Sequence, residues 1–183
     1  KNNFIPMPAS GVSSFIQEPG TQKYWMGIQG KGFAVYNKAT GQLSLPGDNK
    51  EHIAAIDELA DLNSPYNPHF DRKHRLWFQS WGAGFPTIYQ YDINKNEKGR
   101  SFEFITTLKT YYETHDFFEQ KDGTLWVIGL GIFARYNEQE NKFELVYNGY
   151  KNERSIAYER INCIFEDREN NIWIGSNNNG LYR

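Results

Sequence analysis

Two groups of polar side chains near the end of the sequence have the residue types of an active site. Glu166 and Asp167 are adjacent carboxylates, and Asn177, Asn178 and Asn179 form a run of amides. A pair of carboxylates can carry acid and base catalysis only where both converge on one bond. Adjacent residues on a strand point to opposite faces, so Glu166 and Asp167 are not predicted to act as a catalytic pair.

Histidine and cysteine form no recognisable catalytic or ligand set. The four histidines are His52, His69, His74 and His115, and no Asp or Glu stands at a spacing that completes a metal site with them. Cys163 is the only cysteine and has no histidine at useful spacing. It cannot form an internal disulfide and is predicted to lie in the core or to line a channel. We expect no metal, no cofactor and no catalytic residue.

Composition excludes some partners and favours one fold class. The 183 residues include 20 basic and 22 acidic ones, so no overall positive field attracts nucleic acid. No run of eighteen apolar residues and no leader-like start is present, so a membrane link is expected only through segments outside this sequence. Aromatic residues make up 16% of the chain, and strands accommodate such side chains well.

Four tryptophans mark an internal repeat. Trp25, Trp77, Trp126 and Trp173 are separated by 52, 49 and 47 residues. Each follows a polar turn and precedes a glycine-containing loop with an aromatic segment, as in GKGFAVYN, GAGFPTIYQYD, GLGIFARYN and NNGLYR. A further apolar segment follows the first three copies: GQLSLPG, GRSFEFITT and NKFELVYN. Each copy therefore predicts four short strands, and a residue type present in every copy is best explained by packing.

The turns before the tryptophans indicate how the strands pair. Asp122-Gly123 and Asn170-Asn171 stand where the first strand must reverse into the second, and both dipeptides tolerate positive φ. Antiparallel four-stranded units of about 40 to 50 residues that recur around a ring are blades of a β-propeller. We predict an all-β propeller with about four such blades. The acidic residues beside the turns are predicted to satisfy turn backbone groups: Glu18, Asp71, Asp122, Glu166 and Asp167.

Two copies carry a family resemblance. FEDRENNIWIGSNNNGLYR and FEQKDGTLWVIGLGIFARYN resemble the two-component regulator propeller repeat; QEPGTQKYWMGIQGKGFAVYN follows the pattern with drift, and FDRKHRLWFQSWGAGFPTIYQYD lacks the glycine after Trp77-Phe78. The resemblance implies a periplasmic sensor propeller of a hybrid histidine kinase/response regulator. It also implies seven blades per ring and recognition of glycans or their breakdown products.

The repeat sets the expected boundaries. We expect a fourth strand of a preceding blade at 1–10, blades at 11–47, 66–107 and 113–147, an incomplete blade at 158–183, and a helical insertion at 48–65. The insertion either packs on the ring or docks a partner. One interpretation is a fragment of a larger, seven-bladed propeller; the other is that residues 2–8 pair with the open strand of the last blade and close a four-bladed ring. Exposed strand edges favour association, with other blades of the same protein or as a homodimer.

Trp81 is the one tryptophan outside the repeat register, on the glycine-rich loop QSWGAGFPT. It is predicted either to stack on a sugar or to plug the mouth of the propeller. Loops expected on the same face contribute further ligand-binding candidates: Lys31, Tyr66, Tyr111, Tyr112, Tyr158, Arg160 and Asn177 to Asn179, including Asn178. Aromatic rings among amides and charged groups suit a neutral or weakly acidic carbohydrate.

These observations favour a non-catalytic ligand-sensing domain of a hybrid two-component signalling receptor that recognises an oligosaccharide. One alternative is a carbohydrate-active propeller, a glycoside hydrolase or lyase. QKDGTLW is similar to the Asp-box turn of sialidases, but its Asp-to-Trp interval is shorter and no separated carboxylate pair is recognisable. Another alternative is a protein-interaction propeller, although neither the Trp-Asp ending nor the double-glycine kelch pattern is present.

Overall fold

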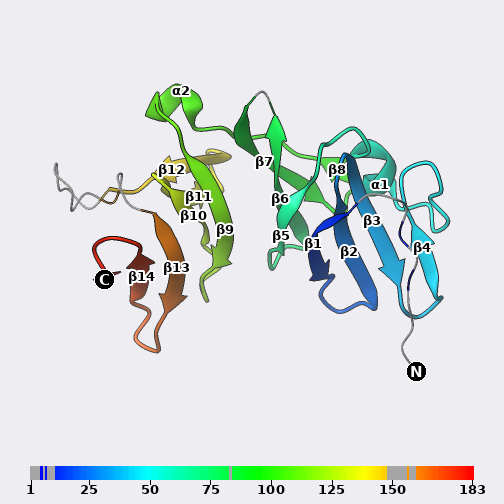
Figure 1. Ribbon diagram of the computed structural model, residues 1–183. Helices are drawn as coiled ribbons and strands as arrows, with labels where there is room; N and C mark the ends of the chain where they lie inside the picture. Colours follow the sequence, from blue (N-terminus) through cyan, green and yellow to red (C-terminus); the bar gives the residue numbers. More distant parts are fainter. Residues whose placement is uncertain (1–4, 6, 8–10, 83, 148–155, 157–159) are drawn as a thin grey trace. The chain divides into compact units, whose positions relative to one another are not determined.

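The strands of the chain form four antiparallel sheets (Figure 1). The computed structural model describes residues 5, 7, 11–82, 84–147, 156 and 160–183. Within each sheet the strands lie in the order in which they follow along the chain. This meander is the topology of a propeller blade.

The sheets correspond to the four sequence repeats. The first contains β1 (Val12–Gln17), β2 (Lys23–Ile28), β3 (Lys31–Asn37) and β4 (Gln42–Ser44). The second contains β5 (Tyr66–Phe70), β6 (Arg75–Gly82), β7 (Phe85–Asp92) and β8 (Glu97–Lys98). The third contains β9 (Glu113–Glu119), β10 (Leu125–Leu130), β11 (Phe133–Asn137) and β12 (Lys142–Leu145). The fourth contains β13 (Ile161–Glu166), β14 (Ile172–Ser176) and β15 (Leu181–Tyr182).

The fourth strand of the second sheet differs from the sequence prediction. GRSFEFITT, residues 99–107, is predicted to be this strand, but β8 ends at Lys98 and only an isolated bridge joins Phe102 to Ile88. Helix α2 (Ile105–Leu108) then follows. The backbone N–H of Phe104 donates to the Tyr112 hydroxyl at 3.1 Å, so beyond Phe102 this donor does not take part in strand pairing.

The turns that lead into the tryptophan strands each contain a residue with positive φ: Gly20, His74, Gly123 and Asn170. Gly123 and Asn170 are among the turn residues that the sequence predicts. Glycine and asparagine reach this backbone region at little cost. The first strand of each repeat can therefore reverse directly into the second.

The chain divides into two compact units, and the division runs through the second sheet. The first unit consists of residues 1–70, 74–81 and 90–99, and the second of residues 71–73, 82–89 and 100–183.

An aromatic cluster forms the core of the first unit. Trp25 is 1% exposed and packs edge-on against Phe33 and Phe70, with ring centroids 5.8 and 6.0 Å apart. Phe33 contacts Phe78 in the same way at 4.9 Å. The repeated tryptophans Trp25 and Trp77 are thus core residues, because each large ring fills space between strands.

Helix α1 (Ala54–Glu58) and the loop after it pack onto the start of β3 in the first unit. Ile56 and Leu59 are fully buried. The backbone N–H of Gly32 donates to the carbonyl of Ala60 at 3.2 Å, and a Cβ at Gly32 would lie 2.2 Å from the Leu59 carbonyl oxygen. The apolar side of the insertion is therefore covered by the chain's own strands, and the partner-docking alternative is wrong for that side.

The core of the second unit joins the third and fourth sheets. Trp126 and Phe133 stack with centroids 4.6 Å apart. They share a core cluster with Ile156, which lies between the two sheets in sequence, and with isoleucines from both sheets: Ile128, Ile161 and Ile174. The third sheet thus shares one hydrophobic core with the fourth.

The N-terminal predictions fall largely outside the described residues. The strand predicted over residues 1–10 and the ring closure predicted for residues 2–8 both concern this part of the chain and stay predictions. Met7 is described and packs against Met26, Ile28 and Ala34. No helix formed by the described residues has the length and apolar character needed to cross a membrane.

Candidate functional site

Four side chains at the starts of β9 and β13 form a polar cluster, composed of Tyr111, Glu113, His115 and Arg160. The Tyr111 hydroxyl donates to Glu113 Oε1 at 2.7 Å, and Arg160 Nη2 donates to Glu113 Oε2 at 3.1 Å. His115 Nε2 lies 3.0 Å from Glu113 Oε2 and 3.3 Å from Arg160 Nη2. Glu113 is therefore the centre of the cluster.

The partners of Glu113 stabilise its charge. Hydrogen bonds from His115 and Tyr111, together with the charge of Arg160, lower the pKa of Glu113, and burial opposes them. In return, the bond to Glu113 raises the pKa of Tyr111. Glu113 thus remains ionised at neutral pH, which suits an acceptor for hydroxyl groups and not a proton donor.

Backbone contacts fix Arg160 beside the third sheet. Arg160 bridges to Leu130 at the end of β10, and its carbonyl accepts from the backbone N–H of Asn177 at 2.9 Å. Asn177 and Asn178 are exposed in the loop between β14 and β15. The structure therefore places Tyr111, Arg160 and the backbone of Asn177 near one another.

Next to the polar cluster lies a concave surface. We call this surface the tyrosine groove. It has a volume of about 410 Å³ and is lined by Thr107, Leu108, Thr110, Tyr111, Leu130, Gly131 and Tyr147. Tyr111 and Tyr147 are 57% and 56% exposed. Exposed aromatic side chains around a groove are typical of ligand-binding surfaces.

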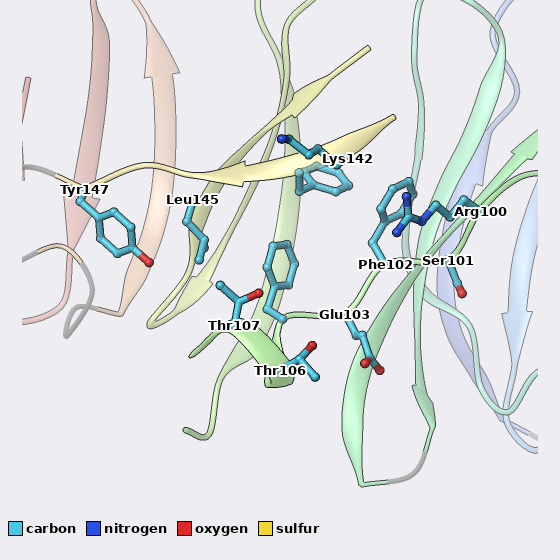
Figure 2. A pocket seen from close by; sticks show the side chains of 11 residues that line it. Arg100, Ser101, Phe102, Glu103, Thr106, Thr107, Lys142, Leu145 and Tyr147 are labelled. Carbon is cyan, nitrogen blue, oxygen red and sulfur yellow. The ribbon is translucent and has the colours of Figure 1, made fainter. Parts of the chain in front are cut away.

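A second depression, the rim pocket, continues from the tyrosine groove. Its volume is about 510 Å³, and its lining includes Arg100, Phe102, Thr107, Phe143 and Tyr147. Figure 2 shows its labelled side chains arising from the segment at Arg100 to Glu103, from α2 and from the β12 region. Thr107 and Tyr147 line both depressions, so the two adjoin each other.

Three predicted ligand-binding residues lie in the first unit, on adjoining loops. Ser64 Oγ accepts from the backbone N–H of Gly30 at 3.0 Å, next to Lys31. The Ser80 hydroxyl donates to the Asn63 carbonyl at 2.5 Å, next to Trp81. Tyr66 is half-buried, whereas Lys31 is exposed and Trp81 is 43% exposed. Trp81 thus presents part of its ring to solvent.

The prediction that Tyr112 binds a ligand is wrong, because this residue is only 1% exposed. Its hydroxyl donates to the Pro86 carbonyl at 2.7 Å and accepts from the Phe104 N–H. It holds the segment before α2 in place and is not accessible to a ligand. The other candidate, Tyr158, lies outside the described residues.

Sequence reasoning missed Glu113, His115, Tyr147 and Arg100. One signal was present: the third and fourth repeats align without a gap, which places Glu113 in register with Arg160. Equivalent positions on neighbouring first strands lie side by side in a propeller. Glu113 and Arg160 carry opposite charges at matching positions of successive repeats, so the sequence contained enough information to recognise them as a pair.

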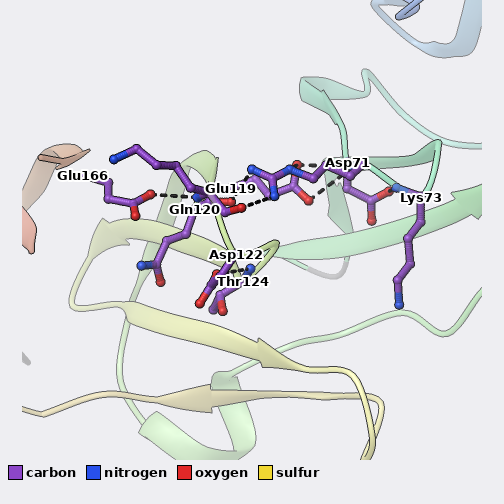
Figure 3. A network of polar contacts seen from close by, with 9 residues as sticks. Asp71, Lys73, Glu119, Gln120, Asp122, Thr124 and Glu166 are labelled. Atoms are coloured by element: carbon purple, nitrogen blue, oxygen red, sulfur yellow. Dashed lines mark hydrogen bonds and ion pairs between the residues drawn. The ribbon is translucent and has the colours of Figure 1, made fainter. Parts of the chain in front are cut away.

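The acidic turn residues form a network at the other ends of the first strands (Figure 3). Glu166 accepts from the backbone N–H of Lys121 at 2.7 Å, and Glu119 accepts from the backbone N–H of Arg72 at 3.2 Å. Asp122 accepts from the backbone N–H of Thr124 at 2.8 Å. The carboxylates satisfy turn backbone groups, as predicted, and they link successive turns.

Turn side chains also accept the indole N–H groups of three of the repeated tryptophans. Trp25 donates to Glu18 at 2.8 Å, Trp126 to Gln120 at 2.6 Å and Trp173 to Asp167 at 2.7 Å. The acceptor can be Glu, Gln or Asp, because the requirement is an oxygen and not a charge. The bond from Trp173 is the main cause that lowers the pKa of Asp167 to about 2.

The described residues hold no metal centre: none of their His, Cys, Asp and Glu side chains form a group of three or more placed to hold an ion. Cys163 is exposed on β13. The geometry therefore offers hydrogen-bond donors, acceptors and aromatic rings, which are the elements of a binding surface.

One part of the chain matches a known family of repeats. Residues 155–178 match the family model described as Two component regulator propeller. No curated protein matches the chain significantly. The matched residues include the tryptophan strand of the fourth sheet, so the resemblance predicted for this repeat is confirmed.

Solved structures share the fold at low sequence identity. The extracellular domain of the putative hybrid two component system BT4673 from B. thetaiotaomicron is 17% identical, with a TM-score of 0.64, over 90% of this chain and 20% of that one. That of BT3049 from B. thetaiotaomicron is 19% identical, with a TM-score of 0.61, over 96% and 22%. A luciferin-regenerating enzyme is 10% identical, with a TM-score of 0.54, over 88% and 52%.

The chain spans about a fifth of the length of the two bacterial structures. At these identities the similarity shows the fold alone. The predicted all-β, partial-propeller architecture is confirmed.

Proposed function

We propose that this chain is part of the extracellular or periplasmic sensor propeller of a two-component signalling receptor, and that it binds a glycan without converting it. The observation that carries the sensor role is the match of residues 155–178 to the regulator propeller repeat. Similarity to extracellular domains of two putative hybrid two component systems supports the same role.

The tyrosine groove and the polar cluster support a glycan as the ligand. Tyr111 and Tyr147 offer ring faces on which the apolar side of a sugar can stack. Thr107 and Thr110 supply hydroxyls in the groove, and Glu113 and Arg160 supply an acceptor and a donor at its edge. A groove of about 410 Å³ lies within the size range of small-molecule sites, roughly 300–1,000 Å³.

The chemistry of the cluster favours binding over glycoside hydrolysis. Hydrolysis uses two separated carboxyl groups, one of them kept protonated by a raised pKa. The polar cluster contains one carboxyl group, that of Glu113, and its pKa is lowered. Glu113 is therefore suited to accept hydrogen bonds from sugar hydroxyls.

The proposal is tested by calorimetric titration of the chain with a panel of oligosaccharides. We expect saturable binding of at least one glycan, with no product detected by chromatography after prolonged incubation. Tyr111→Ala should weaken binding roughly two- to tenfold, because a stacked ring contributes about 0.5–1.5 kcal/mol. Tyr147→Ala should have a similar effect.

Phe165→Ala is the matched control. Phe165 is 62% exposed on β13 and lines neither depression, so its loss should leave affinity unchanged. Turnover of any glycan would contradict the non-catalytic role. Equal binding by wild type and Tyr111→Ala would place the ligand elsewhere and overturn the assignment of the groove.

A further inference from the structure

The rim pocket has a rigid aromatic base. Phe143 packs edge-on against Phe102 and Phe104, with centroids 5.2 and 6.1 Å away. Phe102 exchanges two backbone hydrogen bonds with Ile88, at 2.8 and 2.9 Å, and Tyr112 holds the N–H of Phe104. The base is thus anchored on both sides, and a ligand would find the pocket already formed.

The upper wall of this pocket carries two cations. Arg100 is exposed, and its guanidinium lies 5.9 Å from the centroid of the Phe102 ring. Arg100 has no ion-pair partner among the residues that the structure describes. Lys142 pairs with Glu140, and this contact raises the pKa of Lys142. Arg100 is therefore the cation whose N–H groups are most available.

The one carboxylate of the pocket lining does not oppose these cations. Figure 2 shows Glu103 on the lower side of the view, directed away from the ends of Arg100 and Lys142. Because Lys142 is paired with Glu140, Arg100 supplies the positive charge of the lining that has no ion-pair partner among the described residues. Thr106, Thr107 and Ser101 add hydroxyl groups around it.

We propose that the rim pocket binds an anionic substituent, a carboxylate or a sulfate group, of a saccharide whose neighbouring ring lies in the tyrosine groove. The inference rests on the proposed function, because Thr107 and Tyr147 belong to both depressions and a ligand longer than one sugar can span them. A guanidinium stacked on a ring keeps its edge free, and that edge presents paired N–H donors that match a planar carboxylate or two sulfate oxygens.

The test compares charged and neutral forms of the same sugar by calorimetry. One arm uses uronic acid trisaccharides and their methyl esters; the other uses sulfated disaccharides and their desulfated forms. We expect one charged series to bind at least tenfold more tightly than its neutral counterpart, a difference of ~1.4 kcal/mol. The arm that shows the difference identifies the anionic group.

Variants assign the effect to the pocket. Arg100→Gln should remove most of the preference for the charged form and leave the affinity for the neutral form within about twofold. Arg168→Gln is the matched control, because Arg168 is an exposed arginine in the turn between β13 and β14 and lines neither depression. Thermal unfolding should show that both variants fold.

The outcomes separate this inference from the proposed function. If neutral and charged forms bind equally and Tyr111→Ala weakens both, the groove binds glycans and the rim pocket has no anion preference, which overturns the inference alone. If Arg100→Gln and Arg168→Gln reduce affinity for the charged form equally, the attraction is a general surface effect, and the inference is again overturned. If no glycan of either series or of the wider panel binds, both proposals fail.

Discussion

The two ends of the first strands in the third and fourth sheets use the same residue types in different ways. At the turn end, Glu119 and Glu166 accept from backbone N–H groups of the preceding turn. At the other end, the Glu113 carboxylate contacts side chains of the polar cluster, those of Tyr111, His115 and Arg160. The backbone N–H groups and tryptophans at the turn end recur from repeat to repeat. The side chains of the polar cluster do not recur in this way.

That difference separates structural carboxylates from a functional one. A carboxylate that accepts from backbone N–H groups stabilises the turns of the blade. A carboxylate held by exposed side chains beside a groove can exchange those partners for ligand hydroxyls. The first group should therefore affect stability when changed, and the second should affect binding.

The largest expected effect is on the repeated tryptophans. Trp25→Ala should lower the free energy of unfolding by about 3–5 kcal/mol, because a buried indole and its contacts with Phe33 and Phe70 are lost. Trp81→Ala should change it by less than about 1 kcal/mol, since Trp81 is 43% exposed. Chemical denaturation measures both, and equal losses would contradict the distinction between repeated and singular tryptophans.

The next largest effect on the free energy of unfolding is expected for a carboxylate of the turns, and it can be compared with that for the carboxylate of the polar cluster. Glu18 is 3% exposed and accepts from Trp25 Nε1 at 2.8 Å and contacts His74 Nε2 at 3.1 Å. Glu18→Ala leaves these groups without their acceptor and should cost about 1–3 kcal/mol of unfolding free energy.

Glu113→Ala is the counterpart and should cost less than about 1 kcal/mol, because its partners remain accessible to water. It should instead weaken glycan binding. A larger loss of stability from Glu113→Ala than from Glu18→Ala would reverse the roles assigned to the two ends.

A smaller effect concerns acid. The bond from Trp173 is the main cause that lowers the pKa of Asp167 from its ordinary 3.8 to about 2 in the folded chain. A carboxyl group whose pKa is lower in the folded chain than in the unfolded chain stabilises the fold. This stabilisation is complete when the pH is above the unfolded-state pKa, and it is lost as the pH falls toward the folded-state pKa. Wild-type stability should therefore decline between about pH 5 and pH 2.

Asp167→Asn tests this cause, because asparagine keeps an oxygen for the indole N–H but does not ionise. The melting temperature of Asp167→Asn should depend less on pH in that window than that of the wild type. An identical decline in both proteins would show that other carboxyl groups cause the acid sensitivity. Asp122→Asn offers a comparison, since the backbone and side chain of Thr124 also lower the pKa of Asp122.

Repetition explains which parts of the structure the sequence could predict. The four tryptophans and the turns before them recur at a nearly constant spacing, so strand order and core residues follow from comparing copies. The end of the fourth strand of the second sheet did not follow: β8 ends at Lys98, and beyond Phe102 the backbone N–H of Phe104 donates to the Tyr112 hydroxyl. Local propensity does not report a hydrogen bond between the backbone and a side chain further along the chain.

The candidate site shares some residues with the sequence prediction. Tyr111, Arg160 and Asn177 were predicted to bind a ligand because they lie on loops that differ between copies. Glu113 was missed although it stands in register with Arg160, and Arg100 and Tyr147 were missed because their role depends on pockets that form only after packing. Tyr112 had the expected residue type but a buried position, and exposure is a property that sequence alone does not show.

The most direct test of the account is a titration of wild type, Tyr111→Ala and Glu18→Ala with a glycan that binds. We predict that Tyr111→Ala loses roughly two- to tenfold in affinity with an unchanged melting temperature. Glu18→Ala should keep the wild-type affinity with a lowered melting temperature. Loss of affinity in Glu18→Ala with none in Tyr111→Ala would contradict the claim that the open end of the strands binds the ligand.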